Sequence, residues 1–157
     1  MKRFRLLIII LTLLALFFFL RGHASTVERI HRVSDGKILS LSELTKDLIE
    51  SRLVFVGEIH TFQRHHHVQL QTIRVLKEAG APVAIGFEMF RRDNQSNLDR
   101  WVAGELSERE FEKIYYQNWK YPWPLYRDIF LYARKYKIPM VGLNVPPEVT
   151  RQVAREG

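Results

Sequence analysis

Three short apolar runs, separated by stretches of helical pattern, are the feature that most constrains the fold of this 157-residue chain. The runs cover residues 53–56, 83–87 and 138–143. The first is continuously apolar, which is typical of a strand buried on both faces. Amphipathic patterns between the runs predict helices over residues 62–79, 95–117 (two helices, broken near Gly104) and 125–136. Strands that alternate with helices favour a parallel sheet with right-handed βαβ crossovers, so we predict an α/β fold.

A small β-hairpin is expected before this sheet, because Asp35-Gly36 separates apolar residues on either side. Ser40 and Glu43 have the spacing of a capping box and predict a short helix through Ile49. A last helix is expected from Pro146-Pro147, and the sequence stops soon after it begins. Three strands make a thin sheet for this architecture, so we expect an incomplete domain, the N-terminal part of a longer protein.

Residues 1–24 have the layout of a secretory signal. Basic residues open the chain, residues 6–20 are apolar apart from one threonine, and Gly22 and Ala24 precede Ser25. The apolar run is shorter than the roughly 20 residues that span a bilayer comfortably, although an uncleaved membrane anchor is the alternative. We therefore expect an exported protein, periplasmic or membrane-associated, whose folded part is residues 25–157. If the segment is uncleaved, it is the part that contacts the membrane.

Charge and cysteine content exclude several classes of function. The net charge is +7, but residues 1–24 carry four basic residues and no acidic one. Residues 25–157 contain 20 basic and 17 acidic residues, which gives a net charge of +3. These charged residues are dispersed along the chain. This pattern argues against nucleic-acid binding. The chain has no cysteine, which excludes disulfides, thiolate metal sites, cysteine nucleophiles and a lipoprotein anchor.

Polar residues follow the three apolar runs at equal distances. Glu58 is five residues past Leu53, Glu88 five past Val83, and Asn144 five past Pro139. In a parallel α/β sheet, ligands bind outside the carboxyl ends of the strands. If the strands pair in register, these three side chains share one edge. Each glutamate could instead be a buried acid satisfied by helix N-terminal amides.

Histidines are expected at the same edge. His60 lies two residues past Glu58, and His65, His66 and His67 open the helix that follows. His66 lies at the foot of that helix's apolar stripe, whereas His65 and His67 could simply be solvated. Carboxylates and imidazoles together can bind manganese, zinc or cobalt, with Glu58, His60, His66 and Glu88 as the candidate ligands. Alternatively, Glu58 and His60 can act in general acid–base catalysis.

The aromatic segment 119–126 is the second unusual feature. One interpretation is a loop that covers the edge of the sheet. The other is an apolar wall for a flat or bulky ligand, with a tyrosine as hydrogen-bonding group or metal ligand. Arg91, after the second run, could pair with acidic groups of such a ligand, or it could be solvated.

These segments together resemble the ChaN-like haem-binding family of the Tiki and erythromycin-esterase-like superfamily. The matching pieces are residues 56–60, His65-His66 with Gln69, residues 86–90, the aromatic residues Trp119, Trp123 and Tyr126, and residues 139–146. The resemblance runs from about residue 28 to the end. This chain departs from the family pattern in two ways. Members are often lipoproteins, whereas this chain has no cysteine to carry a lipid, and members are considerably longer.

The resemblance implies an exported, iron-regulated protein that binds haem for haem or iron acquisition, with a homodimer around the haem as one arrangement. The candidate haem contacts are His65, His66, Tyr121, Trp123, Tyr126 and Arg91. Tyr121 and Tyr126 are both candidates for the haem-ligating tyrosine. Superfamily relatives with the Gly-Glu-x-His signature resemble metal-dependent hydrolases or proteases. Haem binding and metal-dependent hydrolysis therefore both remain open at this point.

Overall fold

The computed structural model describes residues 29–157, and the chain divides into two compact units after Ser40. The predicted signal segment, residues 1–24, lies outside the described residues. In the first unit, β1 (Ile30–His31) pairs antiparallel with β2 (Ile38–Leu39). Gly36 turns the chain between them with a φ of 70°, a left-handed conformation that glycine adopts without strain. The predicted hairpin is therefore confirmed.

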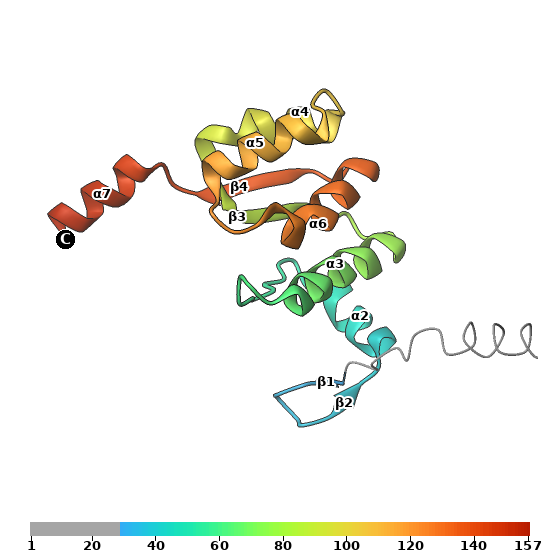
Figure 1. Ribbon diagram of the computed structural model, residues 1–157. Helices are drawn as coiled ribbons and strands as arrows, with labels where there is room; N and C mark the ends of the chain where they lie inside the picture. Colours follow the sequence, from blue (N-terminus) through green and yellow to red (C-terminus); the bar gives the residue numbers. More distant parts are fainter. Residues whose placement is uncertain (1–28) are drawn as a thin grey trace, which may run out of the picture. The chain divides into compact units, whose positions relative to one another are not determined.

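The second unit contains the predicted parallel sheet and its helices (Figure 1). Its elements are α2 (Leu41–Ile49), α3 (Gln63–Glu78), β3 (Ile85–Arg91), the 3₁₀ turn η1 (Arg92–Asn94), α4 (Gln95–Ala103), α5 (Glu108–Asn118), α6 (Trp123–Lys135), β4 (Met140–Asn144) and α7 (Pro147–Glu156). Strands β3 and β4 are parallel neighbours, so the α/β prediction is confirmed. Helix α4 contacts β4, α5 contacts β3, and α6 packs against both α3 and α4.

Local sequence signals set the helix ends. Gly104, with a φ of 91°, ends α4 in a left-handed conformation. Ser107 accepts a hydrogen bond from the Glu110 backbone, and the Glu110 side chain caps Ser107 in return, so α5 starts with a capping box. Helix α6 starts at Trp123, two residues before the predicted start, because a proline at position 124 needs no hydrogen-bond acceptor in a first helical turn.

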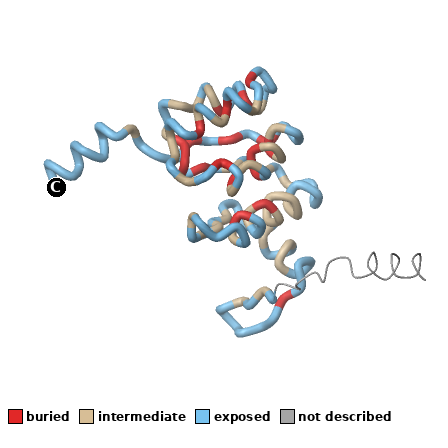
Figure 2. Tube along the Cα trace, in the orientation of Figure 1, coloured by how far each residue is buried: buried red, intermediate tan, exposed pale blue. Residues whose placement is uncertain are grey.

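Aromatic side chains make up the centre of the core. Figure 2 marks where the buried residues lie along the chain. Phe90, Trp101, Phe111, Tyr115, Tyr126 and Phe130 are all fully buried. The Phe87 and Phe130 rings stack at 4.4 Å, which joins β3 to α6. The indole of Trp101 donates a hydrogen bond of 2.9 Å to the Phe130 carbonyl, so its buried N–H is satisfied. This core fixes α6 against the sheet and so fixes the position of Tyr126.

The first predicted strand does not form a ladder. Residues 53–56 belong to no strand, and Leu53 and Phe55 are 70% and 87% exposed. Within the described residues the sheet of this unit contains only β3 and β4. An apolar run indicates a preference for extended backbone, but burial on both faces requires a neighbouring strand. The prediction of a buried strand here was therefore wrong.

The pairing of β3 with β4 also differs from the expected register. Ile85 lies opposite Met140 and Phe87 opposite Gly142, but an irregularity follows and places Asn144 opposite Arg91 instead of Glu88. The β3 backbone approaches β4 closely at this point, because a Cβ on Gly142 would lie 2.7 Å from the Arg91 carbonyl oxygen. Glycine at position 142 therefore permits the irregular ladder.

Helix α7, expected from Pro146-Pro147, is present and has no buried residue. Among residues 29–157, no helix has the length and apolar character needed to cross a membrane.

Gly142→Ala should destabilise the fold by about 1–3 kcal/mol, because the added methyl group meets backbone that cannot move aside. Chemical denaturation monitored by circular dichroism measures this loss. Gly57→Ala is the matched control, since a Cβ at Gly57 meets no atom within 4 Å. Equal stability of the two variants would contradict the close approach at Gly142.

Candidate functional site

The carboxylate of Glu58 is the centre of a polar cluster between the loop before α3, α3 itself and α6. Its Oε1 atom accepts a hydrogen bond of 2.6 Å from the Tyr126 hydroxyl, and His60 Nδ1 lies 2.6 Å from the same atom. His66 Nδ1 lies 2.8 Å from Oε2. The Glu58 side chain is only 10% exposed, so these neighbours replace water around a buried charge.

The first turn of α3 holds the loop that carries Glu58 and His60. The Ile59 N–H donates a hydrogen bond of 2.7 Å to His65 Nδ1. The Phe62 N–H bonds to the Ile59 carbonyl at 2.8 Å, which closes a turn. His66 Nε2 lies 3.1 Å from the His60 carbonyl oxygen. Two consecutive histidines of the helix therefore bind the backbone of the loop, one as acceptor and one as donor.

His66 has acceptor atoms around both ring nitrogens. Its Nε2 must donate to the His60 carbonyl, and its Nδ1 lies 2.8 Å from Glu58 Oε2 and 3.2 Å from Gln69 Oε1. The ring therefore lies between the His60 carbonyl on one side and the Glu58 carboxylate with the Gln69 amide on the other. The contact with Oε2 is electrostatic, because its direction does not suit a hydrogen bond and Oε2 has no hydrogen-bond partner among the described residues.

His60 differs from His66 because one of its ring nitrogens is free. Nδ1 is held by Glu58, and Nε2 makes no hydrogen bond within residues 29–157. The side chain is 30% exposed. The Trp119 ring meets it edge-on at 5.0 Å, and the Tyr121 ring lies 4.6 Å away. A carboxylate therefore orients the imidazole, two aromatic rings hold it, and Nε2 remains available to a ligand.

The pKa values of the two acids of the cluster are shifted in opposite directions, although burial favours the neutral form of both. Burial by itself would raise the pKa of Glu58, but the hydrogen bonds from Tyr126 and His60 and the charge of His66 outweigh it, so the pKa lies below the usual 4.5. The pKa of Tyr126 is raised well above its usual range, chiefly by burial and secondly by the neighbouring Glu58 carboxylate. Glu58 is therefore ionised at neutral pH, and Tyr126 is a neutral hydroxyl that donates to it.

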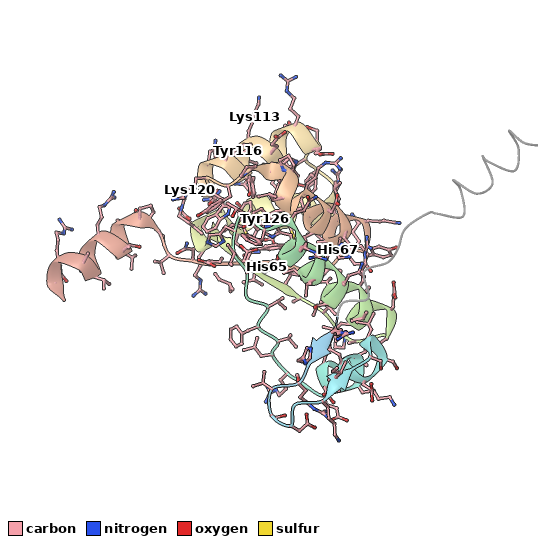
Figure 3. All side chains as sticks on the ribbon, turned by 60° about the horizontal axis from the view of Figure 1, so that its bottom comes forward. His65, His67, Lys113, Tyr116, Lys120 and Tyr126 are labelled. Atoms are coloured by element: carbon pink, nitrogen blue, oxygen red, sulfur yellow. The ribbon has the colours of Figure 1, made fainter. Side chains whose placement is uncertain are left out.

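The structure brings together five of the predicted site residues, Glu58, His60, His66, Tyr121 and Tyr126, and places His65 next to them as the acceptor for Ile59. Figure 3 labels His65 and His67 on α3 and Tyr126 on α6. Gln69 and Trp119, which belong to the segments that carry the resemblance but were not among the predicted ligands, also lie here. Gln69 contacts His66, and Trp119 contacts His60. The three-residue spacing from His66 to Gln69, one helical turn, was the signal for the first.

The structure places the remaining predicted residues elsewhere. Trp123 is buried in the core, where it stacks on Phe130 at 5.4 Å. Arg91 bonds to the Asp93 carboxylate and the Gln117 carbonyl. Glu88 is exposed on β3, and its charge contributes to the raised pKa of Tyr126 without any contact with Glu58. Their roles as ligands stay predictions.

In the part of the chain that the structure describes, no three carboxylate or imidazole groups are placed to hold a metal ion together. The ligand set Glu58, His60, His66 and Glu88 therefore also stays a prediction. Fold and cluster together define an α/β protein with a candidate site that combines one imidazole nitrogen with an aromatic wall.

A comparison with protein families matches residues 44–157 to the family described as haem-binding uptake, Tiki superfamily, ChaN. The chain belongs to this family, as the sequence predicted. Searches of curated proteins and of solved structures gave no significant match.

Glu58→Gln should lower the free energy of unfolding by about 1–3 kcal/mol at pH 7, because bonds to a charged acceptor become bonds to a neutral one. The pKa of Glu58 is depressed in the folded state. Its stabilisation is therefore complete above the unfolded pKa, near 4.5, and is lost as the pH falls through the folded pKa.

The variant should accordingly lose stability less steeply than the wild type as the pH falls below about 4.5, as measured by urea denaturation at several pH values. Glu50→Gln is the control, because Glu50 is exposed. Parallel pH profiles for the wild type and Glu58→Gln would show that Glu58 is not held as described.

Proposed function

We propose that this protein binds haem and that His60 Nε2 is an axial ligand of the iron. The observation that carries the proposal is the hydrogen bond of 2.6 Å between His60 Nδ1 and the Glu58 carboxylate. Histidines that bind iron or zinc usually donate their second ring nitrogen to a carboxylate or carbonyl, which fixes the ring and makes the ligating nitrogen more basic. Membership of a haem-binding uptake family supports haem as the ligand.

The surroundings of His60 suit a flat apolar ligand. The Trp119 and Tyr121 rings both contact the imidazole, and Tyr121 is half-buried. Their own rings lie 5.5 Å apart. A haem on His60 would therefore meet aromatic surface, which binds porphyrins by apolar contact and stacking. When bound, the haem would supply the iron whose coordination His60 completes.

Tyr126 and His66 are already engaged, and His65 is engaged through one ring nitrogen. The Tyr126 hydroxyl donates to Glu58, and its raised pKa disfavours the phenolate that binds iron. His66 is 97% buried, with contacts at both ring nitrogens. His65 accepts a bond from Ile59 through Nδ1. These residues would support His60 and its loop, while Tyr121 would form part of the wall.

Metal-dependent hydrolysis has less support from the same geometry. A general base works best with a pKa near the operating pH, whereas the pKa of Glu58 lies below its usual value. Both short bonds to Glu58 Oε1 also stabilise the ionised form. Glu58 therefore suits the role of an anchor for His60 better than that of a base.

Haemin titration of the wild-type protein should give a shifted Soret band that His60→Ala abolishes. Tyr126→Phe should keep the band, because the phenol is not the ligand in this proposal. His31→Ala, in the exposed part of the hairpin, is the matched control. A wild-type spectrum from His60→Ala, or the loss of the band in Tyr126→Phe alone, would overturn the assignment.

We also propose that the protein is exported, iron-regulated and active in haem or iron acquisition. The basic, apolar and small-residue pattern of residues 1–24 supports export, and the family description supports uptake. Fractionation of cells that express the full chain should place it outside the cytoplasm, with N-terminal sequencing starting at Ser25 if the segment is cleaved. Recovery in the cytoplasmic fraction with Met1 intact would contradict export.

A further inference from the structure

A lysine lies beside the aromatic wall of the site. Lys120 is exposed and its Nζ lies 5.6 Å from the centre of the Tyr121 ring. The same ring lies 4.6 Å from the His60 ring. A single aromatic ring therefore separates this cation from the imidazole, and a planar ligand on His60 that covers Tyr121 would reach the lysine with its edge.

A hydroxyl donor lies close to the same loop. The Tyr116 oxygen accepts a hydrogen bond of 2.9 Å from the Trp123 N–H, and its own O–H has no acceptor among the described residues. The adjacent Tyr115 hydroxyl donates to the Tyr121 carbonyl at 2.9 Å. Two consecutive tyrosines of α5 therefore hold the loop in place, and the exposed one keeps a free proton. Figure 3 shows Lys113, Tyr116 and Lys120 in a row along α5 and the residues after it.

The cations near the site are not equally available. Arg91, the residue predicted to meet acidic groups of a ligand, is bonded to Asp93 and to the Gln117 carbonyl. Lys120, in contrast, makes no ion pair within residues 29–157. An ammonium and a phenol are both donors to a carboxylate, and such charge-assisted bonds are the stronger kind.

We propose that Lys120 and Tyr116 form an anion subsite that receives a carboxylate of the bound porphyrin. This inference rests on the proposed function, because it places the ring of the ligand on His60 and Tyr121. It deepens that function, because it names the residues that receive one carboxylate of the ligand and so fixes the direction in which that carboxylate points.

The test compares haemin with the iron complex of protoporphyrin dimethyl ester, which has the same ring and no free carboxylate. Lys120→Ala and Tyr116→Phe should each weaken haemin binding by about two- to fivefold, as expected for exposed charged contacts, and leave binding of the ester unchanged. The loss for Lys120→Ala should shrink in 1 M salt, which screens exposed charges. Absorbance titration of the 157-residue chain provides both dissociation constants.

Lys77→Ala is the matched control. It removes the same exposed charge from the far end of α3, eleven residues and about 17 Å along the helix from His66. Three results would overturn the subsite: equal losses of affinity for haemin and the ester, no loss for either, or the same loss in Lys77→Ala. In each case His60→Ala would still abolish the Soret shift, so the proposed function would stand. If the wild type binds neither compound, the proposed function fails and the subsite fails with it.

Discussion

The site depends on one buried carboxylate. Glu58 is taken from water into a nearly closed environment, which costs free energy unless the charge is compensated. Tyr126, His60 and His66 provide that compensation from a helix, a loop and a second helix. Each neighbour is in turn oriented by Glu58, so the imidazole of His60 has a fixed direction. Without this charge, no hydrogen bond described at the site would fix the direction of the His60 ring.

The hydrogen bonds of each histidine determine whether it supports the loop or is available to a ligand. His65 and His66 are neighbours in sequence, yet one accepts from the Ile59 backbone and the other donates to the His60 backbone. Both are therefore used to fix the loop. His60 lies on that loop and has the free nitrogen, which is why support and ligand binding fall to different members of the group. Aromatic rings of the segment 119–126 complete this arrangement.

Much of the fold could be predicted from the sequence, because its signals are local. Gly104 and Asp35-Gly36 act through neighbouring backbone atoms, and each marked a predicted helix break or turn. The cluster was predicted in part, because Glu58, His60 and His66 are close in sequence. Pairing between distant segments was not predictable in this way. The irregular ladder at Gly142 and the missing partner for residues 53–56 depend on which backbones approach each other.

The contribution of Tyr126 is the clearest example of such a long-range effect. Its spacing of 68 residues from Glu58 gives no sequence signal that they meet. Only the stacking of α6 on the sheet brings its hydroxyl to the carboxylate. Tertiary packing also distinguishes Tyr121 from Trp123. The Tyr121 ring contacts His60, whereas the Trp123 ring on α6 points into the core.

The site is built from two short stretches, 58–69 and 119–126, and the aromatic core belongs to the second stretch and the elements around it. Most bonds of the loop before α3 are internal to the first stretch. The Tyr126 bond to Glu58 and the Trp119 and Tyr121 rings against His60 tie this loop to the rest of the unit. Such a segment opens at a lower free energy than the whole domain unfolds. Amide hydrogens around Ile59 would then exchange through local opening, a route by which a tightly held ligand can enter or leave while the fold stays intact.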